Sequence, residues 1–575
     1  MSLRCLLSRL LVGLLLPLAI TSTVYLYLYP VWSGCAYPHP QDTSNASSRT
    51  SAFLNTLRQH LAPQSAQEPE AIFRLLVLAD PQLEGDSSLP RSDYELGARI
   101  WKHWNDTVVS ISTAPFFVNS DVVRTVSTAL QIFVSEDLPR SFKAARKRLD
   151  LLGNDCYLAH IYRTLHWWTR PTHVTVLGDL IGSQWVTDGE FQRRGDRYWH
   201  RVFRGGERVS DKITQTGEKD YTARNDGGSH KEESLEELPS SSSWAHRIIN
   251  IVGNHDIGYS GDASEQRVDR FERVFGRSNW DIRFQHPRVQ GANGELTPTL
   301  HLINLNSLTL DGPPFAQNIQ SHGYAYLNDI ISHRSYPVQD RTTFTLLLTH
   351  LPLHKPEGVC TDEPYFTYFD ADDESEDQRY QVGGLREQNH LSEHVSTNGV
   401  LQGIFGINGD EGAPGGGRGR NGLILTGHDH TGCDVVHSID KSPPPPTTSN
   451  NDALTDKEHT TNHPPWTWNA TRYNPSNQGP QATTPSIREI TLRSMMGEYG
   501  GNAGLLSLWF DVDAAEWKYA MAMCPAGVQH IWWAVHVVDF ITLIVAGVYI
   551  LLWVVGSLRA SSSPSLVVGR DKKTR

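Results

Sequence analysis

Two uncharged apolar runs lie near the ends of this 575-residue chain, and they limit what the chain between them can be. The first run is Leu10–Tyr29 and the second is Phe540–Leu558. About 20 apolar residues are enough to cross the hydrocarbon core of a bilayer as a helix. We therefore expect transmembrane helices over residues 10–29 and 531–558. For the first, an uncleaved anchor is favoured over a cleaved signal peptide, because the run continues beyond the length of a signal-peptide core.

Basic residues flank both runs on their terminal sides: Arg4, Arg9, Arg559, Arg570, Lys572, Lys573 and Arg575. Because cytosolic segments carry the excess of Lys and Arg, we expect residues 1–9 and 559–575 in the cytosol. Three N-glycosylation sequons begin at Asn45, Asn105 and Asn469 and support a lumenal position for the intervening chain. The C-terminal Lys-Lys-Thr-Arg resembles the dilysine retrieval signal of endoplasmic reticulum (ER) membrane proteins, which coat proteins bind. A generic basic tail is the alternative.

The chain as a whole is acidic and polar. It has 63 Asp and Glu against 51 Lys and Arg, a formal net charge of −12, and 39% hydrophobic residues. These values exclude a polytopic transporter and argue against a nucleic-acid-binding protein. We expect a linker over residues 30–70 and one lumenal domain over residues 71–530. Four polar segments of that domain are expected to be loops or disordered insertions: residues 205–243, 370–378, 412–422 and 440–485.

Six cysteines are few for this length. Cys5 and Cys524 lie at the expected membrane edges. The other four lie in the expected lumenal part, where one or two disulfides can form: Cys35, Cys156, Cys360 and Cys433. Their spacing matches neither a thiolate metal site nor a redox pair.

Short apolar runs rich in β-branched residues recur through the lumenal part and predict buried strands. These runs are Phe73–Ala79, His173–Leu177, Arg247–Val252, Leu300–Leu305, Thr343–Leu348, Leu423–Leu425, Ile487–Leu492 and Leu505–Phe510. Helices are predicted over Leu89–Ser110 and Ser141–Thr169. Alternating strands and helices indicate an α/β or α+β domain.

Five of the predicted strands are followed at once by side chains that can bind metal. The segments are Asp80-Pro81-Gln82, Gly178-Asp179, Gly253-Asn254-His255-Asp256, Thr349-His350 and Gly427-His428-Asp429-His430. In open α/β sheets, sites form at the carboxyl ends of the strands. A single such Asp commonly caps a turn, but five polar strand ends in succession predict one shared site.

The order of these motifs resembles the calcineurin-like metallophosphoesterase superfamily, whose pattern is D-x-H, G-D, G-N-H-D/E, H and G-H-x-H. The resemblance covers roughly residues 72–435. It implies a four-layer α/β/β/α sandwich, here flanked by two transmembrane helices, with a two-metal centre at the strand ends.

In this superfamily two divalent cations lie about 3.5–4 Å apart and share a bridging carboxylate. The resemblance implies that Asp179 is this bridge. The remaining ligands implied are Asp80 and His430 for one cation and Asn254, His350 and His428 for the other. An amide oxygen and neutral imidazoles suit Mn²⁺, Fe or Zn²⁺ better than Mg²⁺ or Ca²⁺, and we expect Mn²⁺.

His255 would donate a proton or a hydrogen bond to the leaving oxygen, and Asp256 would orient His255. One position departs from the superfamily pattern, because Gln82 stands where the pattern has histidine. A glutamine oxygen is a weaker ligand than imidazole. We therefore expect Gln82 to bind its cation loosely, or another ligand to replace it.

The runs Gly178–Trp185 and Gly253–Tyr259 narrow the resemblance. They are similar to fungal ER enzymes that remodel GPI anchors (the Ted-one type, with the Cdc-one type and animal PGAP-five as relatives). This resemblance implies a phosphodiesterase that removes an ethanolamine phosphate side branch, on the second mannose rather than the first. Its substrates would be GPI-anchored proteins, which then leave the ER through p24-type cargo receptors.

Two alternatives stay open. One is a metallophosphatase that acts on another lumenal phosphoester. The other is a non-catalytic protein that binds and escorts GPI-anchored cargo, with Gln82 as a mark of lost activity.

Overall fold

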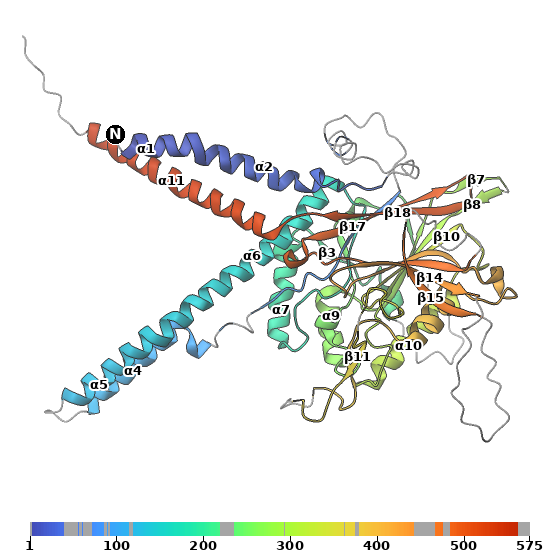
Figure 1. The fold of residues 1–575 in the computed structure, drawn as a ribbon, viewed down its shortest axis with the longest axis horizontal. Coiled ribbons are helices and arrows are strands. Elements are labelled where there is room, and N and C mark those ends of the chain that lie inside the picture. The colour runs from blue at the N-terminus through green and yellow to red at the C-terminus, as the bar shows by residue number, and fades with distance from the viewer. Residues whose placement is uncertain are drawn as a thin grey trace, which may run out of the picture.

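The computed structural model describes residues 3–38, 72–85, 92–113, 119–218, 235–292, 294–361, 363–373, 379–441, 466–474 and 484–561, with residues 54, 56, 60 and 89 between them. Two β-sheets lie at the centre of the described chain, and long helices extend from one end of them (Figure 1).

The first sheet has the strand order β18-β17-β1-β2-β5-β3. Its strands are β1 (Phe73–Leu78), β2 (His173–Val176), β3 (Glu207–Arg208), β5 (Arg247–Asn250), β17 (Asn502–Asp511) and β18 (Glu516–Pro525). Strands β1, β2, β5 and β3 run parallel, whereas β17 and β18 are antiparallel to their neighbours.

The second sheet has the order β15-β14-β16-β13-β10-β9-β6-β4. Its strands are β4 (Leu235–Glu237), β6 (Trp280–Gln285), β9 (Thr299–Leu305), β10 (Thr343–Thr349), β13 (Asn421–Thr426), β14 (Cys433–Asp440), β15 (Thr467–Arg472) and β16 (Ser486–Thr491). Strands β9, β10, β13 and β16 are parallel. Two small hairpins complete the strands: β7 (Val289–Gly291) with β8 (Gly294–Leu296), and β11 (Phe366–Tyr368) with β12 (Leu385–Gln388).

The central strands are apolar on both faces, and this pattern creates the layers. In β1, Phe73, Leu75 and Val77 pack into a core shared by the two sheets, while Leu76 and Leu78 face the opposite side. Successive residues of a strand point to opposite faces, so such a strand must be covered on both. The sheets cover each other on the inner side, and helices cover the outer sides.

Helices cover the outer face of each sheet. Over the first lie α6 (Leu138–Thr169), α7 (Asp188–Arg197) and α9 (Glu265–Phe275), and over the second lie α10 (Gln317–His333) and the π-helix η9 (Val395–Ile404). The layers are therefore helix, sheet, sheet and helix, which confirms the predicted four-layer sandwich.

The predicted strands are all present, with ends shifted by at most a few residues. The predicted second helix lies within α6, and the first corresponds to α4 (Leu96–Thr113). The sequence did not indicate α5 (Asn119–Ile132), which lies between them.

The expectation of loops is wrong in part for three of the four polar segments. Strands β3 and β4 lie in residues 205–243, and β15 lies in residues 440–485. In residues 412–422, β13 begins at Asn421, next to the buried Arg420, which donates to the carbonyls of Ser335 and Ile404. Pairing at a sheet edge satisfies backbone groups without needing an apolar sequence, so composition could not indicate these strands. Of the remaining segment, residues 370–378, the structure describes only residues 370–373.

Helices long and apolar enough to cross a membrane lie at both ends of the described chain, over Leu3–Trp32 and Gln529–Leu558. The first consists of α1 (Leu3–Leu10), the turn η1 (Leu11–Leu15) and α2 (Leu16–Trp32), and the second is most of α11 (Gln529–Ser561). They lie side by side (Figure 1), and the chain is a membrane protein.

Covalent and polar contacts join these two terminal helices. Thr23 Oγ1 donates to Asp539 Oδ2 across 3.2 Å. The disulfide Cys35–Cys524 connects the end of the first helix to β18, just before the second. A second disulfide joins Cys360 to Cys433.

Candidate metal centre

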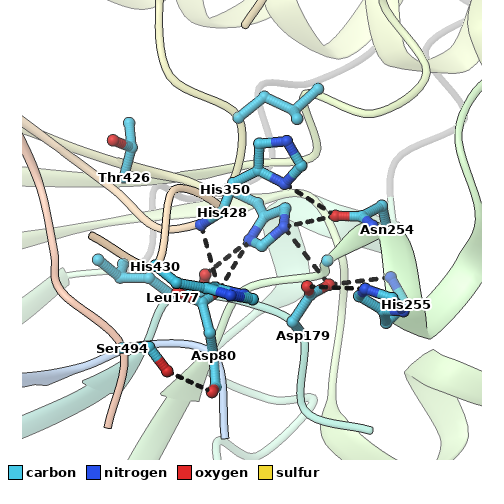
Figure 2. Close-up of polar contacts among 12 residues, drawn as sticks. Asp80, Leu177, Asp179, Asn254, His255, His350, Thr426, His428, His430 and Ser494 are labelled. Carbon is cyan, nitrogen blue, oxygen red and sulfur yellow. Dashed lines mark hydrogen bonds and ion pairs between the residues drawn. The ribbon is translucent and has the colours of Figure 1, made fainter. Parts of the chain in front are cut away.

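Five strand ends bring potential ligands to one edge shared by the two sheets. The side chains, with the strand that each follows, are Asp80 (β1), Asp179 (β2), Asn254 and His255 (β5, at the start of α8, Asn254–Ile257), His350 (β10), and His428 and His430 (β13). Figure 2 shows Asp179, Asn254, His350 and His428 turned toward a common centre. The sequence-predicted residues thus converge in space.

The backbone is strained at four positions of this edge. Asp80, Gln82, Asp179 and His428 have φ values of 51°, 41°, 52° and 73°. Residues other than glycine rarely adopt this left-handed region. Such strain persists where the surrounding structure imposes it, and it concentrates at functional sites.

Two motif glycines permit the close approach of Asp179 and His350. A Cβ on Gly253 would lie 2.0 Å from the backbone nitrogen of Asp179, and one on Gly178 would lie 2.3 Å from Nδ1 of His350. Gly178 also has a φ of 87°. Any larger residue at these positions would push the ligands apart.

Asp80, Asp179 and His350 form the tightest part of the site. One potential ligand atom from each lies within 4.8 Å of the other two, and all three residues are buried. His350 Nε2 is 3.4 Å from Asp179 Oδ1, and His350 Nδ1 is 3.9 Å from Asp80 Oδ1. This spacing suits ligands of one metal ion, or of two neighbouring ions that share Asp179.

Two histidine rings present their lone pairs to the same amide oxygen. Nδ1 of His350 lies 2.8 Å from the carbonyl of Leu177, and Nε2 of His428 lies 2.9 Å from the carbonyl of Gln388. These carbonyls require the N–H on those nitrogens, which fixes the tautomer. The opposite nitrogens then face Asn254 Oδ1 at 2.9 and 3.0 Å as acceptors. Three lone pairs converge there, and a cation would satisfy them.

Gln82 lies inside the site. Its Nε2 is 3.0 Å from Asp179 Oδ2 and 3.0 Å from His430 Nε2. Rotating the amide by half a turn would present Oε1 at the same place. The residue that departs from the superfamily pattern is therefore within reach of a cation bound by Asp179 and His430.

Electrostatics favour a cation as well. Burial and the neighbouring Asp179 charge raise the pKa of Asp80 well above its usual value. Burial lowers the pKa of His428 to about 3 and also lowers that of His350. Burial opposes the ionisation of Asp179, but the nearby imidazoles lower its pKa. The Asp179 charge therefore lies beside rings that burial keeps neutral, and among the described residues Asp80 Oδ2 is buried without a hydrogen-bond partner. The residues fit divalent metal ions.

The Asp256 carboxylate accepts hydrogen bonds from the backbone N–H groups of Gly253 and Ile181, at 2.8 and 3.0 Å. These bonds tie the loop after β5 to the loop after β2, and the orienting of His255 by Asp256 stays a prediction. His255 is held by its own backbone, whose N–H donates to Asp179 Oδ1 over 2.9 Å.

A cavity of about 710 Å³ opens beside the site. Its lining residues are Asp179, Gln184, Trp185, Asn254, His255, Tyr259, Phe369, Asp373, Arg379, Tyr380, Arg386, Glu387, His428 and His430. Sequence reasoning missed most of the wall formed around the β11–β12 hairpin. The sequence feature that could have indicated this wall is the mixture of aromatic and charged residues next to the acidic segment 370–378.

Comparison with known proteins agrees with this site. No protein-family model matches the chain. The chain is 34% identical over 424 residues to Protein TED1 of Saccharomyces cerevisiae, which covers 69% of this chain and 77% of that protein. The chain belongs to the TED1 family of calcineurin-like metallophosphoesterases.

More distant relatives share the same region. An uncharacterised protein of Schizosaccharomyces pombe is 26% identical over 415 residues, covering 68% of this chain and 78% of that protein. Metallophosphoesterase 1 of Danio rerio is 23% identical over 310 residues, covering 50% of this chain and 60% of its own length. Membership of the TED1 family makes the chain a phosphoesterase hydrolase of a class that uses divalent metals.

Proposed function

We propose that this protein is a phosphodiesterase of the ER lumen that removes an ethanolamine phosphate side branch from GPI anchors, with the second mannose as the expected position. The observation that carries the proposal is the cluster of Asp80, Asp179 and His350, which adjoins a cavity lined by acidic and aromatic side chains. The motif runs that resemble the GPI-remodelling enzymes support the choice of substrate.

In this proposal two cations, preferably Mn²⁺, would be held by Asp179 together. Asp80 and His430 would hold one of them, with Gln82 as a weaker ligand, and Asn254, His350 and His428 would hold the second. Bound there, the cations would offset the charge of the phosphodiester and activate a water molecule.

His255 supplies the proton for the leaving oxygen. Its ring lines the cavity and is 37% exposed, with Nε2 at 3.8 Å from Asp179 Oδ2. The hydrogen bond from its backbone N–H to Asp179 fixes the histidine relative to the metal ligands. A donor held at the site edge can reach the leaving group while the buried imidazoles remain neutral ligands.

The outer wall of the cavity suits a primary ammonium group. Phe369 and Tyr380 stack with ring centroids 4.5 Å apart. Tyr259 lies near Glu387, and burial, then the charges of Asp179 and Glu387, raise the pKa of the Tyr259 phenol. A carboxylate beside aromatic rings attracts a cation by charge and by the ring faces. Arg379 and Arg386 line the same cavity and can bind phosphate oxygens.

The proposed location in the ER membrane is supported by the two terminal helices and by the basic C-terminal tail. Two terminal helices anchor the domain in the membrane that holds the GPI lipid, so enzyme and substrate share one surface. Lys572 and Lys573, which lie outside the described residues, would retain the protein in the ER through coat proteins. GPI-anchored proteins freed of the branch would then pass to p24-type cargo receptors.

The decisive experiment incubates the full-length protein in detergent with a branched GPI glycan and measures released ethanolamine phosphate by mass spectrometry. We expect release that requires Mn²⁺, a loss of about 10²–10⁴-fold for His255→Ala, and no release for Asp179→Ala. Asp513→Ala, an exposed carboxylate away from the site, is the control. Normal release by Asp179→Ala would refute the mechanism. No release by the wild type, with tight glycan binding, would favour an escort protein.

A further inference from the structure

A helical arm extends away from the sheets and exposes apolar side chains along each of its helices. The arm consists of α4, α5, the turn η5 (Phe133–Asp137) and the first half of α6, up to Leu152. Its exposed apolar residues include Trp101, Trp104, Val108 and Ile111 on α4; Val123, Val126 and Leu130 on α5; Val134 on the turn; and Phe142, Leu149 and Leu152 on α6. Residues three and four apart share one face of a helix, so each helix carries an apolar stripe.

The stripes are not the inner face of the arm. On α4 the inward positions are Arg99 and His103, which both bind the buried Asp137 at 2.8 Å. The rings of Trp101 and Trp104 point outward and are 65% and 63% exposed. Large apolar side chains therefore lie on the outside of α4 beside exposed polar residues such as Lys102 and Asp106, and such an exposed apolar surface normally marks an interaction site.

The second half of α6, which joins the arm to the sheets, lies beside the terminal helices. Trp532 of α11 contacts Tyr157 of α6 with ring centroids 6.3 Å apart, and Tyr27 of α2 contacts His160 at 5.1 Å. Trp168 Nε1 donates to the carbonyl of Tyr27. Trp and Tyr gather at the level of the lipid headgroups. Figure 1 shows the arm and the terminal helices leaving the sheets from the same end.

Basic side chains border the stripe on α6. Arg146 lies one turn after Phe142 and is 86% exposed, and Lys143 is exposed beside it. Long basic side chains can place their charge among lipid phosphates while their stems lie over apolar surface. A second copy of the chain would need a complementary face, whereas a bilayer crossed by the terminal helices would lie close to the second half of α6, from which the arm extends.

We propose that the apolar stripes of the arm lie in the lumenal headgroup layer of the bilayer that the terminal helices cross. The arm then acts as a third attachment and fixes the height of the cavity above the membrane. A phosphodiester at a set distance from its lipid would meet the cavity only at such a fixed height. The contact between the arm and the bilayer does not depend on which phosphoester is cleaved.

The test uses the full-length chain in vesicles of phosphatidylcholine, phosphatidylethanolamine and phosphatidylinositol. Cys5 and Cys156, the two cysteines outside the disulfides, are first replaced by serine. A polarity-sensitive fluorophore is then attached to Trp104→Cys, on the stripe, or to Lys102→Cys, on the opposite side of α4. We expect emission at shorter wavelength and quenching by headgroup-level nitroxide lipid only for the label at position 104.

Equal quenching at both positions, or at neither, would overturn the proposal. Crosslinking between Trp104→Cys residues of two copies without lipid quenching would assign the stripe to a dimer instead.

A second measurement uses a variant with Trp101, Trp104 and Phe142 changed to serine. Hydrolysis of a soluble nitrophenyl phosphodiester should be unchanged, whereas hydrolysis of a vesicle-bound lipid phosphodiester should fall. Equal rates of the wild type and the variant on the vesicle-bound substrate would contradict the arm's role. The labelling result can be interpreted even if GPI is not the substrate.

Discussion

Asn254 Oδ1 lies 2.9 Å from Nε2 of His350, and the proton of that ring is committed to the carbonyl of Leu177. Two acceptors at this distance repel each other, and a cation bound by both atoms would remove the repulsion. The relationship therefore fits a metal ion held by Asn254 and His350.

Replacing His350 by alanine should remove metal and activity together. We expect a fall of at least about 10–100-fold in metal affinity, as found when metal sites lose supporting groups. Metal content of the purified protein, measured by mass spectrometry of the elements, checks this. His246→Ala, which alters an exposed histidine away from the site, should retain its metal. A His350→Ala protein with full metal content would contradict the ligand assignment.

Changing Gln82 to histidine should tighten the site. The Gln82 amide already lies 3.0 Å from both Asp179 and His430, and imidazole is a better ligand than an amide. We expect half-maximal activation at a lower Mn²⁺ concentration for Gln82→His and at a higher one for Gln82→Ala. A titration of activity against free Mn²⁺ measures both. Identical titrations for all three proteins would place Gln82 outside the metal shell.

The positions of the candidate metal ligands were predictable because these residues follow strands. Carboxyl ends of neighbouring parallel strands meet at one edge, so Asp80 and Asp179 had to lie near each other once β1 and β2 were recognised. The match to the superfamily pattern then connected the first sheet with His350 in the second.

Other features could not be read from local sequence. The partner of Cys35 is 489 residues away, and no spacing rule reaches that far. Glu387 lies on a short hairpin whose charged composition resembles a loop. The role of Asp256 depended on which backbone N–H groups its carboxylate meets, and that is set only by tertiary packing.

Replacing Glu387 by glutamine should weaken recognition of the amine and spare the chemistry. Glu387 lines the cavity wall and is not one of the strand-end ligands. We expect a severalfold higher KM for a phosphodiester of ethanolamine, an unchanged kcat, and no change for the N-acetylated substrate, which has no positive charge. Steady-state kinetics on the two substrates separates these effects. An equal loss of activity on both substrates would show that Glu387 does not recognise the ammonium group.

A buried ion cluster beside the strand ends should be important for stability. Glu489 accepts a hydrogen bond from Lys355 at 3.1 Å and contacts His437 Nε2 at 2.5 Å. Burial opposes ionisation, but Lys355 and His437 lower the pKa of Glu489 to about 2. Glu489→Gln leaves the Lys355 charge buried without its partner, which should cost about 3–5 kcal/mol. Urea unfolding in detergent measures this loss, and Lys355→Met added to Glu489→Gln should recover part of it. No recovery would mean that the two residues do not interact energetically.

His173 should make the fold sensitive to acid. Its ring stacks on Phe73 with centroids 4.0 Å apart, and burial lowers its pKa from 6.5 to about 3. Between these pH values the unfolded chain binds a proton at this position and the folded chain does not. Stability from His173 is therefore complete above about pH 6.5 and is lost by about 1.4 kcal/mol per pH unit as the pH falls toward 3.

The variant His173→Phe removes this proton linkage while keeping an aromatic ring against Phe73. We expect its free energy of unfolding to decline less steeply than that of the wild type between about pH 6 and pH 4. Urea titrations at a series of pH values measure the slopes, which are compared with those of His246→Phe at an exposed position. The comparison uses slopes rather than absolute stabilities, because the larger ring also changes packing. Parallel curves for the wild type and His173→Phe would show that the buried imidazole is not the source of the acid sensitivity.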